Sequence, residues 1–298
     1  MKKLLIIFSI FFTFQISYSQ NDENISQRLR ALVSKDITFY NIDGYSITSQ
    51  IWNSEFTEKG LKKPFKKYSV KEEDSKIKDD SLQFNNYYVV KNEKISDALT
   101  QNTSYYFVEN SNKTITILSF SKVNKSNKKF ERNFATLVLN NKIPNECFDT
   151  MTIDNINFAG RKIQLSSSCY WTNINTVQCP YYGEMNWSVH KELEDAKQSV
   201  ENQLSVTKSQ KGGKVISEEM VDIIFEENEV KVKKVIYDIK GVNSLLAGMS
   251  GGKTLTIYYV ASPVRGNFVS CVLSFWNNDQ INESGLPPLL EKVMKLKK

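Results

Sequence analysis

The feature that most constrains the fold of this 298-residue sequence is a pattern that occurs twice. In Lys253–Phe275, an aromatic strand-like run, Leu255–Ala261, is followed by a short turn and an aliphatic run, Phe268–Phe275. Runs of this kind around a turn with Pro and Gly indicate a β-hairpin. Ser104–Phe120 repeats the pattern, and a helix-like stretch follows each copy. We interpret the repetition as a duplicated structural module.

Further elements are predicted from turn signals and from the spacing of apolar residues. The dipeptides Asp43-Gly44, Ala159-Gly160 and Glu227-Asn228 each separate two strand-like runs, as expected for hairpins. Apolar residues at helical spacing indicate helices. Helices are expected at residues 21–35, Phe56–Tyr68, Lys128–Leu139, Ser188–Leu204 and Leu286–Leu296, and a single strand is expected at Val177–Asn186.

The order of these elements predicts an α+β fold of two tandem related modules, residues 20–143 and residues 144–298. Each module is expected to be an antiparallel sheet covered by helices, because hairpins dominate and no βαβ series occurs. In element order the chain resembles the PsbP-like fold. YYVASPVRGNFVSCVLSF, with LPPLLEKVMKL behind it, is the part most similar to that family. The resemblance implies an antiparallel sheet between helices, ending in a hairpin and a helix.

The N-terminus has the pattern of a secretory signal peptide. Lys2 and Lys3 precede an apolar run from Leu4 to Ile16, and Ser17-Tyr18-Ser19 supplies small residues before Gln20. The apolar run is too short to cross a bilayer, which takes about 20 residues. We therefore expect residues 1–19 to be removed and the protein to be soluble in the periplasm, without a transmembrane segment. An extracellular location is the alternative.

The charge balance indicates no nucleic-acid partner. Without Lys2 and Lys3, 37 basic residues face 33 acidic ones, and this surplus is small. One local group of lysines is interleaved with aromatic residues and can form a basic surface for an anionic envelope polymer or a membrane. Alternatively, this segment is a charged helix whose aromatic residues pack inward. The lysines are Lys59, Lys62, Lys63, Lys66 and Lys67.

Four cysteines lie in the expected second module, residues 144–298: Cys147, Cys169, Cys179 and Cys271. An even number in an oxidising compartment suggests disulfides, with three possible pairings. Cys169 and Cys179 flank a turn-like Asn-Ile-Asn segment, so we expect these two to be bonded across a hairpin. The other two can instead be small buried residues.

Four aromatic residues within Cys169–Trp187 form the strongest candidate for a binding surface. If exposed together, such residues favour saccharide or peptide ligands or a protein partner. If buried, they are large core residues. The four are Trp171, Tyr181, Tyr182 and Trp187.

No catalytic residues, metal ligands or cofactor sites are predicted. The sequence contains one histidine, His190, and lacks Cys-x-x-Cys spacing, so a zinc site of either common type is not expected. We therefore expect a non-enzymatic binding or accessory module with a protein or envelope-polymer partner. Two alternatives stay open: a hydrolase of a cell-envelope or saccharide substrate with a carboxylate site, and a neutraliser that binds one toxin.

Overall fold

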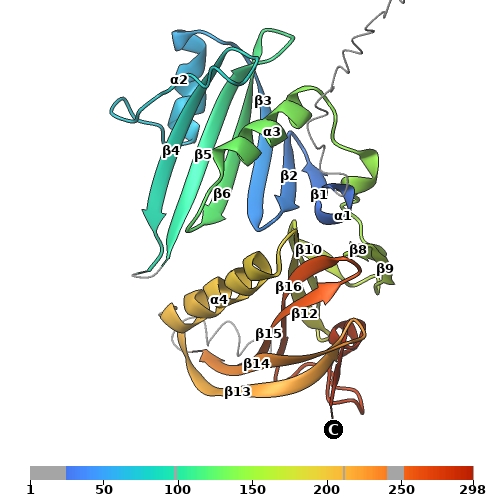
Figure 1. The fold of residues 1–298 in the computed structure, drawn as a ribbon. Coiled ribbons are helices and arrows are strands. Elements are labelled where there is room, and N and C mark those ends of the chain that lie inside the picture. The colour runs from blue at the N-terminus through green and yellow to red at the C-terminus, as the bar shows by residue number, and fades with distance from the viewer. Residues whose placement is uncertain (1–24, 97–98, 211, 240–251, 298) are drawn as a thin grey trace, which may run out of the picture.

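The computed structural model describes residues 25–96, 99–210, 212–239 and 252–297, so the expected signal peptide lies outside the described residues. Strands hold 49% of the described residues and helices 19%. The fold is therefore sheet-dominated, and the predicted α+β class with helices covering each sheet is wrong. Two large, mainly antiparallel sheets account for the architecture (Figure 1).

The first large sheet has seven strands in the order β4-β5-β6-β3-β2-β1-β7. Its last pair, β1 with β7, is parallel. The cluster under α2 fills one face, around Phe107 and Ile117, and the cluster under α3 fills the other, around Tyr106 and Phe120. The elements are α1 (Ile25–Arg28), β1 (Arg30–Ser34), β2 (Ile37–Ile42), β3 (Tyr45–Glu55), α2 (Glu58–Lys67), β4 (Asn86–Lys94), β5 (Thr100–Glu109), β6 (Thr114–Val123), α3 (Lys128–Leu139), η1 (Asn145–Cys147) and β7 (Phe148–Asp149).

The second large sheet has eight strands in the order β10-β11-β12-β16-β15-β14-β13-β17. Helix α4 packs on one face through Val200 and Leu204, and the β8-β9 hairpin and α6 contribute to the core on the other face. The elements are β8 (Asn155–Phe158), β9 (Arg161–Gln164), β10 (Tyr170–Asn173), β11 (Thr176–Cys179), β12 (Gly183–His190), α4 (Leu193–Ser209), β13 (Gly213–Phe225), β14 (Asn228–Ile239), β15 (Thr254–Val264), β16 (Asn267–Trp276), α6 (Pro288–Glu291) and β17 (Met294–Leu296).

Both large sheets are connected in the same way. In each, three consecutive strands are followed by a helix and then by a second run of antiparallel strands. The last strand of the second run pairs with the last strand of the first run. These central pairs are β6 with β3 and β16 with β12. Ile117 on β6 packs in the cluster under α2, and Val272 on β16 packs against the cluster under α4. The two segments therefore have corresponding neighbours.

The predicted hairpins with tight turns are present. Their turn residues have positive φ at both central positions, which is the type I′ geometry that joins twisted antiparallel strands. The turn expected at Glu227-Asn228 is shifted by one residue, because Asn228 already belongs to β14. The φ values are 49° and 76° for Asp43-Gly44, 47° and 89° for Ala159-Gly160, 46° and 73° for Glu226-Glu227, and 48° and 78° for Arg265-Gly266.

Three predicted elements are wrong. Arg30–Ser34 is strand β1, because it pairs with β2, and among the described residues of that predicted helix only Ile25–Arg28 are helical. In the C-terminal tail, Met294–Leu296 pairs with β13 instead of continuing a helix. The single strand expected at Val177–Asn186 is two strands that pair as a hairpin, and His190 ends the second one, so α4 begins at Leu193. In each case strand pairing decides the conformation of a short apolar run, with a neighbouring strand for β1 and β11 and with a distant one for β17.

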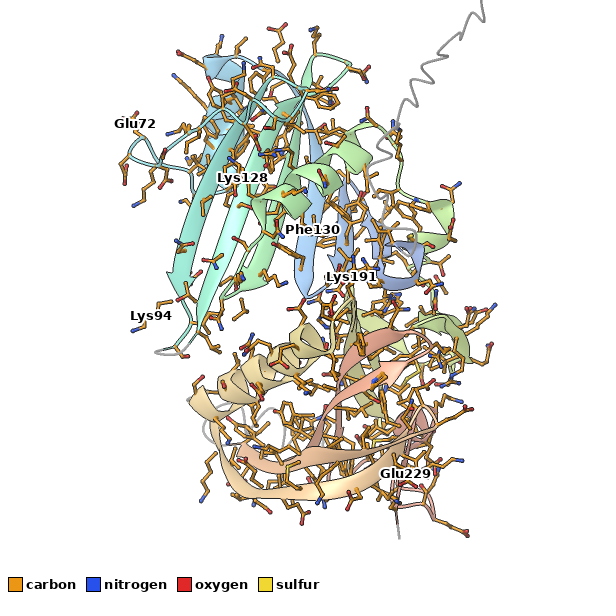
Figure 2. The ribbon with its side chains drawn as sticks, in the orientation of Figure 1. Glu72, Lys94, Lys128, Phe130, Lys191 and Glu229 are labelled. Carbon is orange, nitrogen blue, oxygen red and sulfur yellow. A yellow bond between two sulfur atoms is a disulfide. The ribbon has the colours of Figure 1, made fainter. Side chains whose placement is uncertain are left out.

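The two sheet regions meet at the Asp43-Gly44 turn and the end of β12. The Asp43 backbone N–H donates to the Val189 carbonyl at 3.1 Å, and the Lys191 N–H donates to Asp43 Oδ1 at 2.9 Å. Lys191 is labelled at this junction in Figure 2. His190 is buried there, where burial and the charges of Lys122 and Arg28 lower its pKa to about 3. The histidine is thus a neutral packing residue at neutral pH, with Nε2 2.8 Å from Ser270 Oγ.

Beneath α3, a fully buried carboxylate is satisfied by hydroxyl groups. Glu131 accepts hydrogen bonds from Ser104 Oγ at 2.6 Å, from Tyr88 at 3.1 Å and from Tyr45 at 3.4 Å. Lys128, labelled on α3 in Figure 2, places Nζ 4.5 Å from the ring centroid of Tyr88. Burial and the neighbouring Glu131 raise the pKa of both tyrosines. The network fastens α3 to three strands of the first sheet.

Glu131→Gln is expected to lower the free energy of unfolding by about 1–3 kcal/mol, because an amide N–H₂ then faces hydroxyl groups that need an acceptor. Urea denaturation followed by circular dichroism measures the change. The matched control is Glu146→Gln at an exposed position, which should stay within about 0.5 kcal/mol of the parent. Equal stability of the two variants would contradict a structural role for the Glu131 network.

Candidate functional site

A cleft lies between α4 and the facing side of the eight-stranded sheet. Its larger compartment has a volume of about 410 Å³, and an adjoining compartment has about 200 Å³. Four residues line both compartments, so the two adjoin: Glu184, Leu255, Ser274 and Trp276. The larger compartment alone lies in the size range of pockets that hold small molecules. Val123, at the end of β6, also lines the larger compartment, so the first sheet region contributes to its rim.

The lining of the larger compartment is mainly apolar because of strand alternation. Residues at every second position of β14, β15 and β16 face α4, and most of them are aliphatic or aromatic. Trp276 packs against Gly252, where a Cβ atom would lie 2.9 Å from its ring, so this glycine leaves room for the indole. The main apolar lining residues are Val206, Ile239, Leu255, Ile257, Val272 and Trp276.

Two tyrosines add polar groups to this apolar lining. The Tyr259 hydroxyl donates to Thr207 Oγ1 on α4 at 2.8 Å. Tyr237 is only 5% exposed, and its hydroxyl has no hydrogen-bond partner among the described residues. Its ring packs directly on Gly213, where a Cβ atom would lie 2.4 Å from the ring. Tyr237 lines the larger compartment, and its buried hydroxyl lacks the partner that such groups normally have.

Two carboxylates lie at the smaller compartment. Burial raises the pKa of Glu184 above its usual value. Burial also raises the pKa of Asp279, although the Trp276 backbone N–H donates to Asp279 Oδ2 at 2.9 Å and opposes that shift. Glu184 lies opposite Ser274 in the β12-β16 ladder.

An ion-pair cluster fastens the C-terminal end of α4 to the sheet. Lys208 on α4 and Lys233 on β14 each lie 2.6 Å from a carboxylate oxygen of Glu218 on β13. Hydrogen bonds from the two lysines lower the pKa of Glu218. One end of the helix is thus tied to β13 and β14, while the cleft remains open between its last turns and the sheet.

The four aromatic residues predicted as a binding surface do not lie together on the surface. Trp187 is fully buried, and Arg30 places its guanidinium carbon 4.1 Å from that ring centroid and 4.7 Å from that of Trp171. Trp171 is half-buried, and its Nε1 donates to the Thr150 carbonyl at 3.0 Å. Tyr182 packs against the core, whereas Tyr181 is 60% exposed and lines the smaller compartment. Only Tyr181 therefore belongs to the cleft.

The five predicted surface lysines are all exposed on α2, and the aromatic residues of this segment pack inward. Phe65 lies edge-on against Phe107 at 4.7 Å between centroids. Pro64 leaves the Gly60 carbonyl without its helical donor, and Ser54 Oγ donates to that carbonyl at 3.1 Å instead. Lys67 Nζ donates a hydrogen bond to Gln50 Oε1 at 2.6 Å. A role of the lysines in anionic binding stays a prediction.

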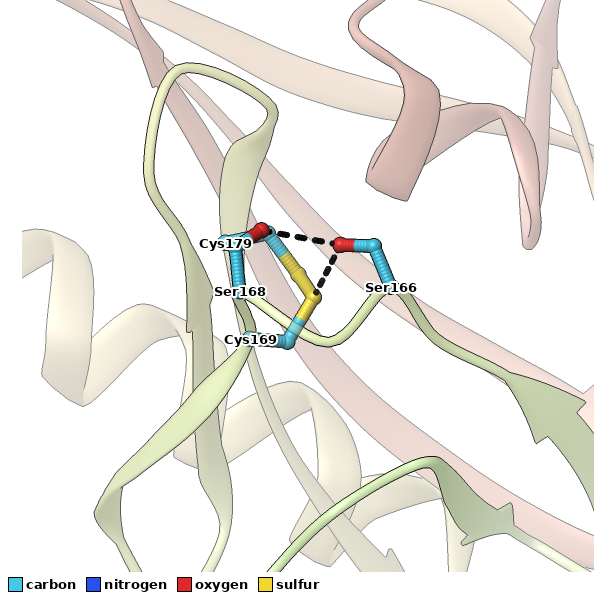
Figure 3. Close-up of a disulfide and its surroundings, with 4 residues drawn as sticks. All are labelled: Ser166, Ser168, Cys169 and Cys179. Atoms are coloured by element: carbon cyan, nitrogen blue, oxygen red, sulfur yellow. Dashed lines mark hydrogen bonds between the residues drawn. A yellow bond between two sulfur atoms is a disulfide. The ribbon is translucent and has the colours of Figure 1, made fainter.

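The predicted disulfide Cys169–Cys179 is present (Figure 3). Ser166 Oγ lies 3.2 Å from Cys169 Sγ and 3.0 Å from Ser168 Oγ. Cys179 also lines the smaller compartment, so the disulfide supports one wall of the cleft. Cys147 and Cys271 are free and buried, and burial raises the pKa of Cys147 to about 12.

The described residues contain no group of three or more His, Cys, Asp or Glu side chains that could hold a metal ion. Asp79, buried beneath α3, accepts hydrogen bonds from Tyr106 at 2.8 Å and from Arg132 at 2.9 Å, so its carboxylate is occupied. Glu226 is held by Arg161 and Arg265. No helix in the described part of the chain is long and apolar enough to cross a membrane.

Comparison with known proteins does not show a family. No protein-family profile and no curated protein matches the chain. The crystal structure of DynU16, a protein in the dynemicin biosynthetic locus, is 7% identical with a TM-score of 0.18, and the match covers 88% of this chain and 81% of that chain. The di-domain ARO/CYC StfQ from the steffimycin biosynthetic pathway is 12% identical with a TM-score of 0.17, and the match covers 91% and 81%. TM-scores this low carry no argument about fold or function.

Sequence reasoning missed the cleft because its residues come from β11 to β16 and from α4. Glu184 lies in the aromatic stretch that was singled out, but it has no distinguishing neighbour in the sequence. Alternation along β12 is the one available signal. It puts Glu184 and Asn186 on one side of the sheet and Met185 and Trp187 on the other.

Arg30→Met is expected to lower the free energy of unfolding by about 3 kcal/mol, because it leaves the partly buried Asp149 without its ion-pair partner. The variant also loses the stacking of the guanidinium on the two indoles. Urea denaturation monitored by tryptophan fluorescence measures both effects. Lys129→Met, at an exposed position of α3, is the control, and comparable stability of the two variants would contradict this account.

Proposed function

We propose that this protein is a non-enzymatic binding protein that holds a small, mainly apolar molecule in the cleft between α4 and the eight-stranded sheet. The observation that carries the proposal is the mainly apolar compartment of about 410 Å³, which has Tyr237 and Tyr259 among its lining residues. Mostly apolar pockets with a few placed polar groups are the usual form of small-molecule sites. Asp79 and Glu131 already accept hydrogen bonds from neighbouring side chains, which argues against a hydrolytic role for these two buried carboxylates.

We further propose that the protein acts in the periplasm after export. The N-terminal pattern of charged, apolar and small residues supports this proposal, and so does the disulfide, which persists in oxidising compartments. Intact-mass measurement of the protein recovered from a periplasmic extract is the test. The expected chain begins at Gln20, and recovery with residues 1–19 still attached would contradict export by signal cleavage.

The binding proposal predicts that filling the cleft removes binding. The probe is the neutral dye N-phenyl-1-naphthylamine, whose fluorescence rises in apolar sites. Val206→Trp places a large side chain into the larger compartment from α4, and it is expected to weaken dye binding at least tenfold.

The matched control is Glu201→Trp, which adds the same side chain on the exposed side of α4. It should bind the dye as the parent protein does. Urea denaturation of both variants separates loss of the site from loss of the fold. Absence of dye binding by the parent, or equal binding by Val206→Trp, would count against the proposed site.

A further inference from the structure

The charge of the cleft is opposite to the charge of the protein. The sequence carries a formal net charge of +6. Of the described residues that line the two compartments, only Glu184 and Asp279 are charged, and none is lysine, arginine or histidine. The other lining residues are apolar or uncharged polar, so a site with two carboxylates and no basic side chain repels anions and attracts cations.

The Glu184 carboxylate has unused capacity to bind a ligand. It makes no hydrogen bond or ion pair within the described part of the chain, whereas Asp279 accepts the Trp276 N–H. Glu184 lines both compartments, so a group bound to its carboxylate lies where they join. The raised pKa of Glu184 has burial as its cause, consistent with a carboxylate that lacks a compensating cation.

The structure also provides for the apolar body of a ligand. The larger compartment extends from Glu184 along Ile257 and Val272 to the last turns of α4. Tyr237, which is 5% exposed, also lines this compartment. A cation bound at Glu184 therefore has the apolar surface of the larger compartment beside it.

We propose that the cleft selects an amphiphile with an apolar body and a protonated amine, with the amine on Glu184 and the body in the larger compartment. This inference rests on the proposed function and names the class of ligand. An ammonium group supplies hydrogen-bond donors and a positive charge to Glu184, with Asp279 adding to the attraction. A fatty acid or another anionic amphiphile places its charge against these carboxylates and is excluded.

The test compares three probes that share one chain and differ only in the head group: dodecylamine, dodecanol and dodecanoate. Each is titrated against N-phenyl-1-naphthylamine bound to the parent protein at neutral pH, with the two ionic probes below their micelle concentrations and dodecanol below its solubility limit. The amine is expected to bind at least tenfold more tightly than the carboxylate, with the alcohol between them. Glu184→Gln is expected to weaken amine binding about tenfold and to leave dodecanol binding unchanged. Glu201→Gln, the same change on the exposed side of α4, should change neither.

The outcomes separate the two proposals. If the dye does not bind or no probe displaces it, the proposed cleft function is wrong. If all three probes bind but dodecanoate binds as well as dodecylamine, the cleft function stands and the amine selectivity is wrong. The same conclusion follows if Glu184→Gln retains the full amine preference. Should that variant fail to fold, the order of the three probes on the parent protein still decides the inference.

Discussion

The pairing of β12 with β16 is the interaction on which the rest of the second sheet depends. It brings residues 183–190 beside residues 267–276 over seven matched positions, from Glu184 with Ser274 to His190 with Phe268. One side of this ladder carries Trp187 and Cys271 into the core, and the other carries Glu184 and Ser274 into the cleft. The core and the binding surface are therefore two faces of one pair of strands. A shift of register by one residue would exchange them.

The cleft exists because the sheet-facing residues of α4 change from apolar to polar toward its C-terminal end. Its sheet-facing positions begin as Ala196, Val200 and Leu204, which are buried against the sheet. One turn later Thr207 lines the cleft, and so does Gln210, the residue that follows α4. Polar side chains gain little from burial against the aliphatic surface of β14 and β15, so the end of the helix contacts the sheet through polar groups and leaves the cleft beside them. Thr207 accepts the hydrogen bond from Tyr259, and Lys208 forms the ion pair with Glu218.

Local signals predicted part of the fold. Hairpins around Asp43-Gly44 and Ala159-Gly160 could be recognised because the turn residues and both strands lie within a few positions of each other. The disulfide was predictable for the same reason, since a hairpin turn separates its cysteines. Arg30–Ser34 was misassigned because its turn to β2 is Lys35-Asp36, which lacks the Gly or Asn of a recognisable hairpin turn, and because its other partner, β7, is distant in sequence. The end of the tail was misassigned because its partner, β13, is also distant. The fold class was wrong because strands outweigh helices among the described residues, 49% against 19%.

The candidate site was not predictable from composition, because proximity in sequence and proximity in space differ on a strand. Trp187 and Glu184 are three positions apart, yet alternation sends the indole into the core and the carboxylate into the cleft.

The net charge of the chain is also a poor guide to the charge of the cleft. The small basic surplus of the chain would favour anions, but the lysines lie on outer surfaces such as that of α2, and none lines the cleft within the described residues. A ligand held between α4 and the sheet would experience the two nearby carboxylates more strongly than distant lysines, whose field is screened over about 10 Å at ordinary ionic strength. The selectivity that we propose therefore follows from the local charge where the two compartments adjoin and not from the net charge.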